Sequence, residues 1–299
     1  MKTRTILGLV LLIGAGFGVR NLPPTVSVGL AELWPWATTT VTLYFPDGRV
    51  IVPVSRRMKK NIDLPRATLQ ALVDGPVAGS GLKSPIPRGV EIRSFGLKEG
   101  VAHIDLSPAF LEEPSQTRAA ETAIVETMTA LRGVTSVSLS VDGQLRAASA
   151  GRVPLVYYAS ANGLVAVPVS AITPRAALAT YLSEPPAPGL TGLPPDVRLL
   201  GYEHDTGKGL LSLGFSYTPS VRTLALEQPD RMRLLLLGLI ATLTEFPSVR
   251  AVRLDFEGQT RLGLGQCSDL LGTAQPRPSL LNDERLLARS KHDGDYLLR

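Results

Sequence analysis

The sequence predicts an α+β protein made of two tandem copies of one small domain. Three observations support this prediction: the chain has 299 residues, one order of hydrophobic segments occurs twice, and glycine and proline punctuate those segments. At about 100 to 200 residues per domain, the length suits two domains. Each copy reads β-β-α-β-β-α-β with short turns, so we expect each to form a mixed, mostly antiparallel sheet with two helices on one face.

The repeat divides the chain into five parts. We expect a signal peptide or N-terminal membrane anchor at 1–20, a linker at 21–39, a first domain at 40–147, a second domain at 153–265 and a C-terminal tail at 266–299. The composition agrees with folded domains, because 44% of the residues are hydrophobic and 19% are charged. Such a chain is too apolar to be disordered.

A β-hairpin opens each copy. Residues 41–54 and 154–169 each hold two hydrophobic runs, separated by Asp-Gly at 47–48 and Asn-Gly at 162–163. Aspartate, asparagine and glycine accept the positive φ angles that tight hairpin turns require. The two segments therefore predict matching hairpins, and we expect the connection between the copies around residues 143–152.

Each copy also contains two predicted helices. Pro65 and Pro174 occupy matching positions at the start of the first helix, and Thr173 provides an N-cap before Pro174. We expect Ser115 to cap the second helix of the first copy. The corresponding helix of the second copy carries Leu234–Ile240, which is apolar around too much of its circumference for a helix with an exposed outer face.

The N-terminal segment predicts export. Lys2 and Arg4 precede residues 6–19, which carry no charge. At 1.5 Å per residue this run spans ~21 Å, short of the ~30 Å hydrocarbon core of a membrane. Such a segment is typical of a signal peptide, and a retained anchor is the open alternative. No cysteine follows the run, so the sequence lacks a lipoprotein attachment site there.

Residues that could carry catalysis do not converge in the sequence. We expect His103 on the solvated face of a strand and His204 in a polar turn. Asp105 and Ser107 flank a strand exit, where their oxygens suit backbone hydrogen bonds better than catalysis. We therefore predict no catalytic, metal or cofactor site and no enzyme activity. The net charge of +5 is spread along the chain, so nucleic acid is not an expected partner.

Two features are candidates for contacts with other macromolecules. A basic run between a strand and a helix is expected in an exposed loop, where a solvated surface is the more common role and contact with anionic lipid or a cell-wall polymer is the alternative. The apolar helix surface either packs between the domains, which we favour, or meets a partner. The candidate interaction residues are Arg56, Arg57, Lys59, Lys60, Leu234 and Leu237.

Several segments of the first copy together resemble the GerMN domain of sporulation and spore-germination proteins. They are the opening hairpin, a helix that ends at Gly75-Pro76, the loop Ser-Pro-Ile-Pro-Arg-Gly at 84–89 and the segment 100–110. The resemblance covers about 40–145 and, more loosely, 153–265. The second copy has Gly-Phe-Ser where the first has Asp-Leu-Ser, so the fold carries over without a shared chemical site.

The resemblance implies a non-enzymatic envelope protein that acts in sporulation or spore germination. It implies a scaffold component of a complex between mother cell and forespore, with envelope proteins of the sporulation machinery as partners. The implied location is the outer face of the cell membrane or the intermembrane space of the engulfed forespore. A cell-wall or peptidoglycan-binding module without catalytic activity is the alternative. GerMN proteins of this kind are typically lipoproteins, and the missing cysteine departs from that pattern.

Overall fold

The computed structural model describes most of the chain, namely residues 38–60, 63–257, 261–284 and 287. Contacts divide the chain into two compact units. The larger unit, Thr40–Arg56 with Pro65–Arg299, holds both repeats, and the smaller comprises Met1–Thr39 and Arg57–Leu64. The predicted export segment and residues 21–37 of the linker lie outside the described residues. Among the described residues, no helix combines the length and apolar character needed to cross a membrane.

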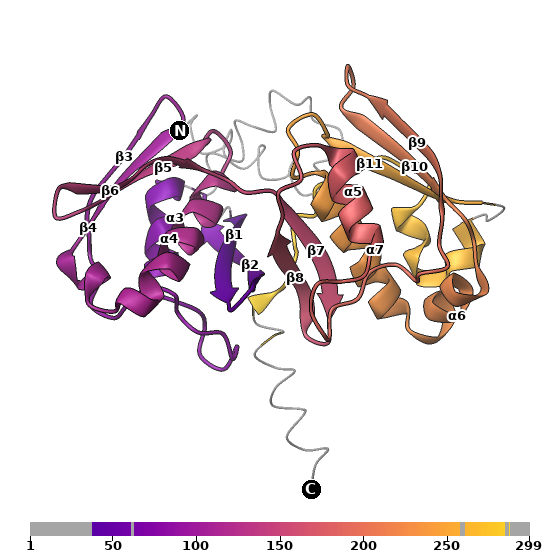
Figure 1. The fold of residues 1–299 in the computed structure, drawn as a ribbon, viewed down its shortest axis with the longest axis horizontal. Coiled ribbons are helices and arrows are strands. Elements are labelled where there is room, and N and C mark those ends of the chain that lie inside the picture. The colour runs from indigo at the N-terminus through magenta and orange to yellow at the C-terminus, as the bar shows by residue number, and fades with distance from the viewer. Residues whose placement is uncertain (1–37, 61–62, 258–260, 285–286, 288–299) are drawn as a thin grey trace, which may run out of the picture. The chain divides into compact units, whose positions relative to one another are not determined.

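The two predicted hairpins are confirmed, and together they form one sheet, which we call the shared sheet. Strands β1 and β2 span Thr38–Asp47 and Val50–Lys59, and β7 and β8 span Leu155–Ser160 and Gly163–Pro168. Their order is β1-β2-β8-β7 (Figure 1). The expectation of one sheet per repeat is therefore wrong in this detail, because β2 of the first repeat pairs antiparallel with β8 of the second.

The remaining strands of the first repeat form a second sheet. Strands β3 (Ile92–Lys98), β4 (Val101–Leu106), β5 (Ser136–Val141) and β6 (Gln144–Gly151) lie in the order β3-β4-β5-β6. Only the β4–β5 pair is parallel, so the predicted mostly antiparallel character is confirmed. Residues 143–152, expected to connect the copies, thus contain strand β6. Asp142 and Gly143 adopt positive φ angles and turn the chain back into β6.

Helices cover one face of this sheet. Helix α3 spans Leu64–Val73 and α4 spans Pro114–Thr129, after a short 3-10 helix η2 at Pro108–Leu111. Figure 1 shows α3 and α4 between the sheet and strands β1 and β2. Ser115 does not cap α4, because the helix begins one residue earlier, at Pro114, and has no side-chain cap bond.

The second repeat follows the same plan with additions. Its sheet has the order β12-β11-β10-β9, and β10 and β11 are parallel. The strands are β9 (Leu199–Asp205), β10 (Leu210–Phe215), β11 (Ala251–Phe256) and β12 (Gln275–Pro276). The helices are α5 (Pro174–Leu182), α6 (Pro219–Glu227), α7 (Pro229–Leu243) and the 3-10 helix η3 (Arg261–Leu270). Helix α6 and strand β12 were not predicted.

The helix caps explain where α5 and α6 begin. Thr173 accepts a hydrogen bond from the backbone N–H of Ala176 at 3.2 Å, as predicted. Thr218 repeats the arrangement at the start of α6, where its hydroxyl accepts from Val221 N–H at 3.3 Å. A threonine followed by proline therefore begins both helices.

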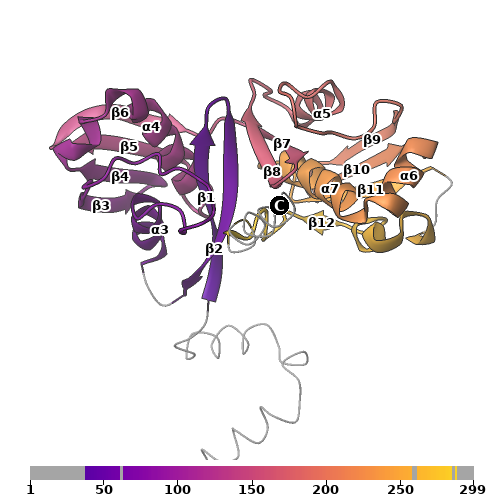
Figure 2. The ribbon, with the colours of Figure 1, turned by 90° about the horizontal axis from the view of Figure 1, so that it is seen from below.

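Helix α7 lies against the shared sheet, beside β7 (Figure 2). Gly238 permits this approach, because a Cβ there would lie 2.6 Å from the carbonyl oxygen of Tyr157. Leu234 and Leu237 pack against the cluster of buried side chains that lines the shared sheet and includes Tyr44 of the first repeat. Both leucines are partly buried, and their contact with a cluster that includes Tyr44 agrees with the favoured packing between the domains.

The segment 281–284 fastens the shared sheet where β2 and β8 meet. The side-chain N–H₂ of Asn282 donates to the carbonyl oxygens of Pro53 and Leu164, and its oxygen accepts from the N–H of Leu164. Leu287 N–H donates to the carbonyl oxygen of Asp283. The side chain of Asn282 thus bonds to strands of both repeats.

Candidate functional site

The basic run differs from the predicted exposed loop. Residues 56–59 continue strand β2, and Arg56 is partly buried. Its guanidinium binds both carboxylate oxygens of Glu284, at 2.9 and 2.7 Å, and the carbonyls of Ala71 and Gly75. The prediction of an exposed Arg56 is therefore wrong. Because side chains alternate along a strand, Arg57 and Lys59 are exposed, as is Lys60 in the turn that follows.

The residues considered for catalysis lie at the surface or bond to the backbone. His103 is exposed on β4, as predicted, whereas His204 lies within strand β9 and not in the predicted turn. Asp105 accepts a hydrogen bond from Gly143 N–H at 2.9 Å, and Ser107 accepts one from Glu91 N–H at 3.0 Å. Both oxygens thus bond to backbone, although to neighbouring strands and loops instead of the following helix. The described residues contain no group of three or more His, Cys, Asp or Glu side chains arranged to hold a metal ion.

A group of buried polar side chains joins the two repeats, and we call it the junction cluster. Its members are Tyr44, Glu126, Arg152, Tyr157, Glu245 and Arg277. The two tyrosine hydroxyls meet at 3.0 Å. Tyr44 and Tyr157 lie at matching positions of the two hairpins, and each donates its backbone N–H to a threonine of the α-helix behind it, Thr127 or Thr242.

Arg152 connects the two repeats directly. Its Nε lies 3.1 Å from a carboxylate oxygen of Glu126 and 3.0 Å from one of Glu245. Its Nη2 donates to the hydroxyl of Tyr44 at 2.6 Å, and the guanidinium lies over the Tyr44 ring. The single side chain thus contacts acids from α4 and from the end of α7, and its cation faces an aromatic ring as well.

Arg277 is the counterpart of Arg152 in the second repeat. Its Nη2 lies 2.6 Å from Glu245 and donates to the Tyr157 hydroxyl at 2.9 Å. Tyr157 in turn donates to the same Glu245 oxygen at 2.7 Å. Each arginine comes directly after the last strand of its repeat, β6 or β12. Glu245, whose side chain is 1% exposed, therefore receives two guanidinium groups and a hydroxyl.

Burial raises the pKa values of two side chains in this cluster. It raises the pKa of Glu126 from 4.5 to about 7, because removal from water outweighs the opposing pull of Arg152 and of Val153 N–H. Burial likewise raises the pKa of Tyr157 well above its ordinary value of 10. Two arginines and two glutamates face one another, so their formal charges balance when both acids are ionised. The ion pairs balance the charges within the cluster, which suits it to holding the repeats together, and Glu245 Oε2 has its ion-pair contact with Arg152 but no hydrogen bond.

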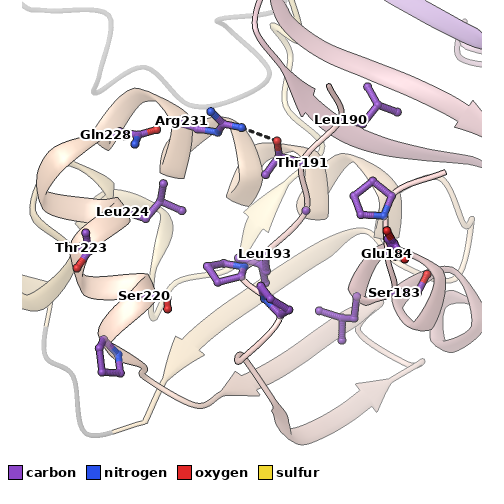
Figure 3. Close-up of a pocket in the computed structure, with 16 residues that line it drawn as sticks. Ser183, Glu184, Leu190, Thr191, Leu193, Ser220, Thr223, Leu224, Gln228 and Arg231 are labelled. Atoms are coloured by element: carbon purple, nitrogen blue, oxygen red, sulfur yellow. Dashed lines mark hydrogen bonds between the residues drawn. The ribbon is translucent and has the colours of Figure 1, made fainter. Parts of the chain in front are cut away.

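An open groove lies elsewhere, in the second repeat (Figure 3). It has a volume of about 930 Å³ and is formed by the loop after α5, the segment 190–195 and helix α6. Leu193 and Leu224 lie between its two sides, and Glu184 and Thr223 lie on opposite sides. Arg231 at the start of α7 donates to the hydroxyl of Thr191 at 2.6 Å at one end of the groove.

Sequence reasoning missed both the groove and the junction cluster. The groove depends on α6, for which the pair Thr218-Pro219 was an available signal of the same kind as Thr173-Pro174. For the cluster, the matching tyrosines of the two hairpins were visible. The pairing of Arg152 with Glu245 across 93 residues had no local signal.

Comparison with known proteins agrees with the duplicated fold. The model of the Germane family, described as sporulation and spore germination, matches residues 42–146 and again 155–262. The chain therefore belongs to this family and is a tandem GerMN protein. A search among curated proteins found no match.

Solved structures give the same fold. The tandem GerMN domains of the sporulation protein GerM from Bacillus subtilis are 19% identical, with a TM-score of 0.61 over 82% of this chain and 99% of that one. The first GerMN domain of the same protein matches at 17% identity, with a TM-score of 0.30 over 38% of this chain and 93% of that one. The likeness to the tandem structure concerns the fold.

Removing Glu245 leaves two buried guanidinium groups without their shared acid. We expect Glu245→Ala to lower the free energy of unfolding by about 3–5 kcal/mol, measured by urea denaturation. Glu257→Ala, at an exposed position of the same repeat, is the control and changes it by less than about 0.5 kcal/mol. Equal losses for the two variants would contradict the structural role of the cluster.

Glu126 makes stability depend on pH. The folded state holds the Glu126 proton more tightly, with a pKa of about 7 against 4.5, so its stabilising contribution is complete below pH 4.5. That contribution is lost as pH rises through 7, by roughly 3 kcal/mol for a shift of this size. Urea denaturation between pH 4.5 and 8 measures this, and Glu126→Gln removes this part of the pH dependence. Glu121→Gln on the same helix is the matched control. An unchanged profile in Glu126→Gln would contradict the raised pKa.

Proposed function

We propose that this protein is a non-enzymatic structural component of the envelope in sporulating cells. It acts as a scaffold that helps to assemble a complex between mother cell and forespore through protein contacts. Membership of a sporulation and spore-germination family supports the pathway. The predicted export segment supports a location beyond the membrane, because Lys2 and Arg4 precede an uncharged run.

The junction cluster is the observation that carries the scaffold proposal. In the junction cluster, Arg152 contacts Glu126 of its own repeat and Glu245 of the other, and Arg277 pairs with the same Glu245, so these buried charged groups, of the kind that a catalytic site would draw on, are engaged with one another. The shared sheet and segment 281–284 add hydrogen bonds across the same junction. A protein whose polar interior couples two repeats presents its outer surfaces in a fixed arrangement, which is what an assembly component requires.

A deletion strain of the organism that encodes the chain tests the proposal. We expect fewer heat-resistant spores and incomplete assembly at engulfment, both restored by the wild-type gene supplied in trans. Normal sporulation and germination in the deletion strain would contradict the proposal, as would abundant product confined to vegetative cells. Release of soluble fragments from purified spore cortex by the full-length chain would contradict its non-enzymatic character.

Cell-wall binding is the second candidate function. The exposure of Arg57, Lys59 and Lys60 along the end of β2 and the turn after it favours it, since three cations suit an anionic wall polymer. Sedimentation of the full-length chain with purified cell wall measures this function. Wall binding that is lost when all three are changed to glutamine, and kept when exposed Arg222 is changed instead, would favour this candidate over the scaffold.

A further inference from the structure

We propose that the groove of the second repeat binds an extended peptide segment of a partner protein. The segment carries apolar side chains for the floor of the groove and a carboxylate for Arg231. This inference rests on the proposed function as an assembly protein and deepens it, because it names the site and the chemistry of the partner.

The size and position of the groove suit a peptide. Its volume of about 930 Å³ lies at the upper end of the range of about 300–1,000 Å³ for pockets that enclose small ligands. The groove is open to solvent and lies between the loop after α5 and helix α6, so a segment of another chain can reach it from outside (Figure 3).

The floor of the groove is apolar and already formed. Leu193 is buried, and Leu182, Leu190 and Leu224 are partly buried against the core of the second repeat. Four prolines, at 185, 194, 195 and 219, also line the groove and restrict its backbone. A ligand therefore meets apolar surface that needs little reordering, which lowers the entropic cost of binding.

Arg231 supplies the cation for the carboxylate of the ligand, and Glu184, across the groove from Thr223, is the acidic residue of the lining. Arg231 is exposed, and its Nη2 donates a hydrogen bond to the Thr191 hydroxyl. Among the described residues it forms no ion pair, whereas Arg233 two positions later binds both carboxylate oxygens of Asp269 at 2.8 Å. A guanidinium offers five N–H donors in a planar fork, so Arg231 retains donors for a carboxylate of the ligand.

The lining favours a peptide over a glycan. None of the sixteen lining residues is aromatic, and the apolar surface comes from leucine and proline. Such surface gains free energy by covering apolar side chains, which a hydroxyl-covered sugar does not offer. Hydroxyls of Ser220 and Thr223 stand on the α6 side, where they can bond to a peptide backbone.

The α6 side of the groove is particular to the second repeat. Between β4 and α4 of the first repeat, the four-residue 3-10 helix η2 stands where the second repeat has the nine-residue helix α6. The loop after α3 therefore faces no such helix, and we expect one partner segment per chain.

Selection from a phage-displayed library of random 12-residue peptides on the full-length chain tests the inference. We expect enriched sequences to combine Leu, Ile, Val or Pro with one Asp or Glu. Synthetic copies of them, measured by fluorescence anisotropy, lose about tenfold or more in affinity for Arg231→Gln and for Thr223→Trp, which fills the groove. Arg231→Lys retains part of the affinity. Arg222→Gln on α6, at an exposed residue outside the groove, is the matched control and leaves it unchanged.

Each other outcome overturns the inference. It fails when no sequence is enriched, or when enriched peptides bind the groove variants and the wild type equally. It also fails when purified wall glycan binds in a manner that depends on Arg231 and the peptides do not. Thermal unfolding of each variant shows whether its fold is intact.

Complementation separates this inference from the proposed function. We expect that the Arg231→Gln, Thr223→Trp double variant does not restore the yield of heat-resistant spores in the deletion strain, although it accumulates to the level of the wild type. When the double variant restores spore yield, the groove inference fails and the scaffold proposal stands. When deletion itself has no effect on sporulation, the scaffold proposal fails whatever the peptides show.

Discussion

The ion pairs of Glu245 with Arg152 and Arg277 decide how the two repeats act together. A buried carboxylate costs free energy unless cations and hydrogen-bond donors compensate it, and the cations around Glu245 come from both repeats. Each repeat also keeps one ion pair of its own, Arg152 with Glu126 or Arg277 with Glu245, and the contact between Arg152 and Glu245 joins the two. The repeats are therefore coupled through Glu245, and we look for the function in the pair.

The shared sheet follows from the same constraint. Each hairpin on its own has unpaired edge strands, and an unpaired edge invites association with other chains. Pairing of β2 with β8 covers one edge of each hairpin and leaves β1 and β7 at the margins of the sheet, and segment 281–284 bonds to β2 and β8 beside that contact. The cations after Arg56 and the groove beside α6 are two surfaces that stay open to other macromolecules.

Local features of the sequence were sufficient to predict the repeats, their hairpins and the cap at Thr173, because turn residues and helix starts act over a few positions. The burial of Leu234 and Leu237 followed from a helix too apolar to expose a face. The partners of Arg56 and Arg152 could not be predicted, since Glu284 and Glu245 lie 228 and 93 residues away. The groove was missed with α6, although Thr218 marks its start.

Differential scanning calorimetry of the full-length chain tests most directly whether the repeats form one unit. The account predicts a single transition whose calorimetric and van't Hoff enthalpies agree, because the shared sheet and the junction cluster couple both repeats. Two separate transitions, each assignable to one repeat, would contradict it.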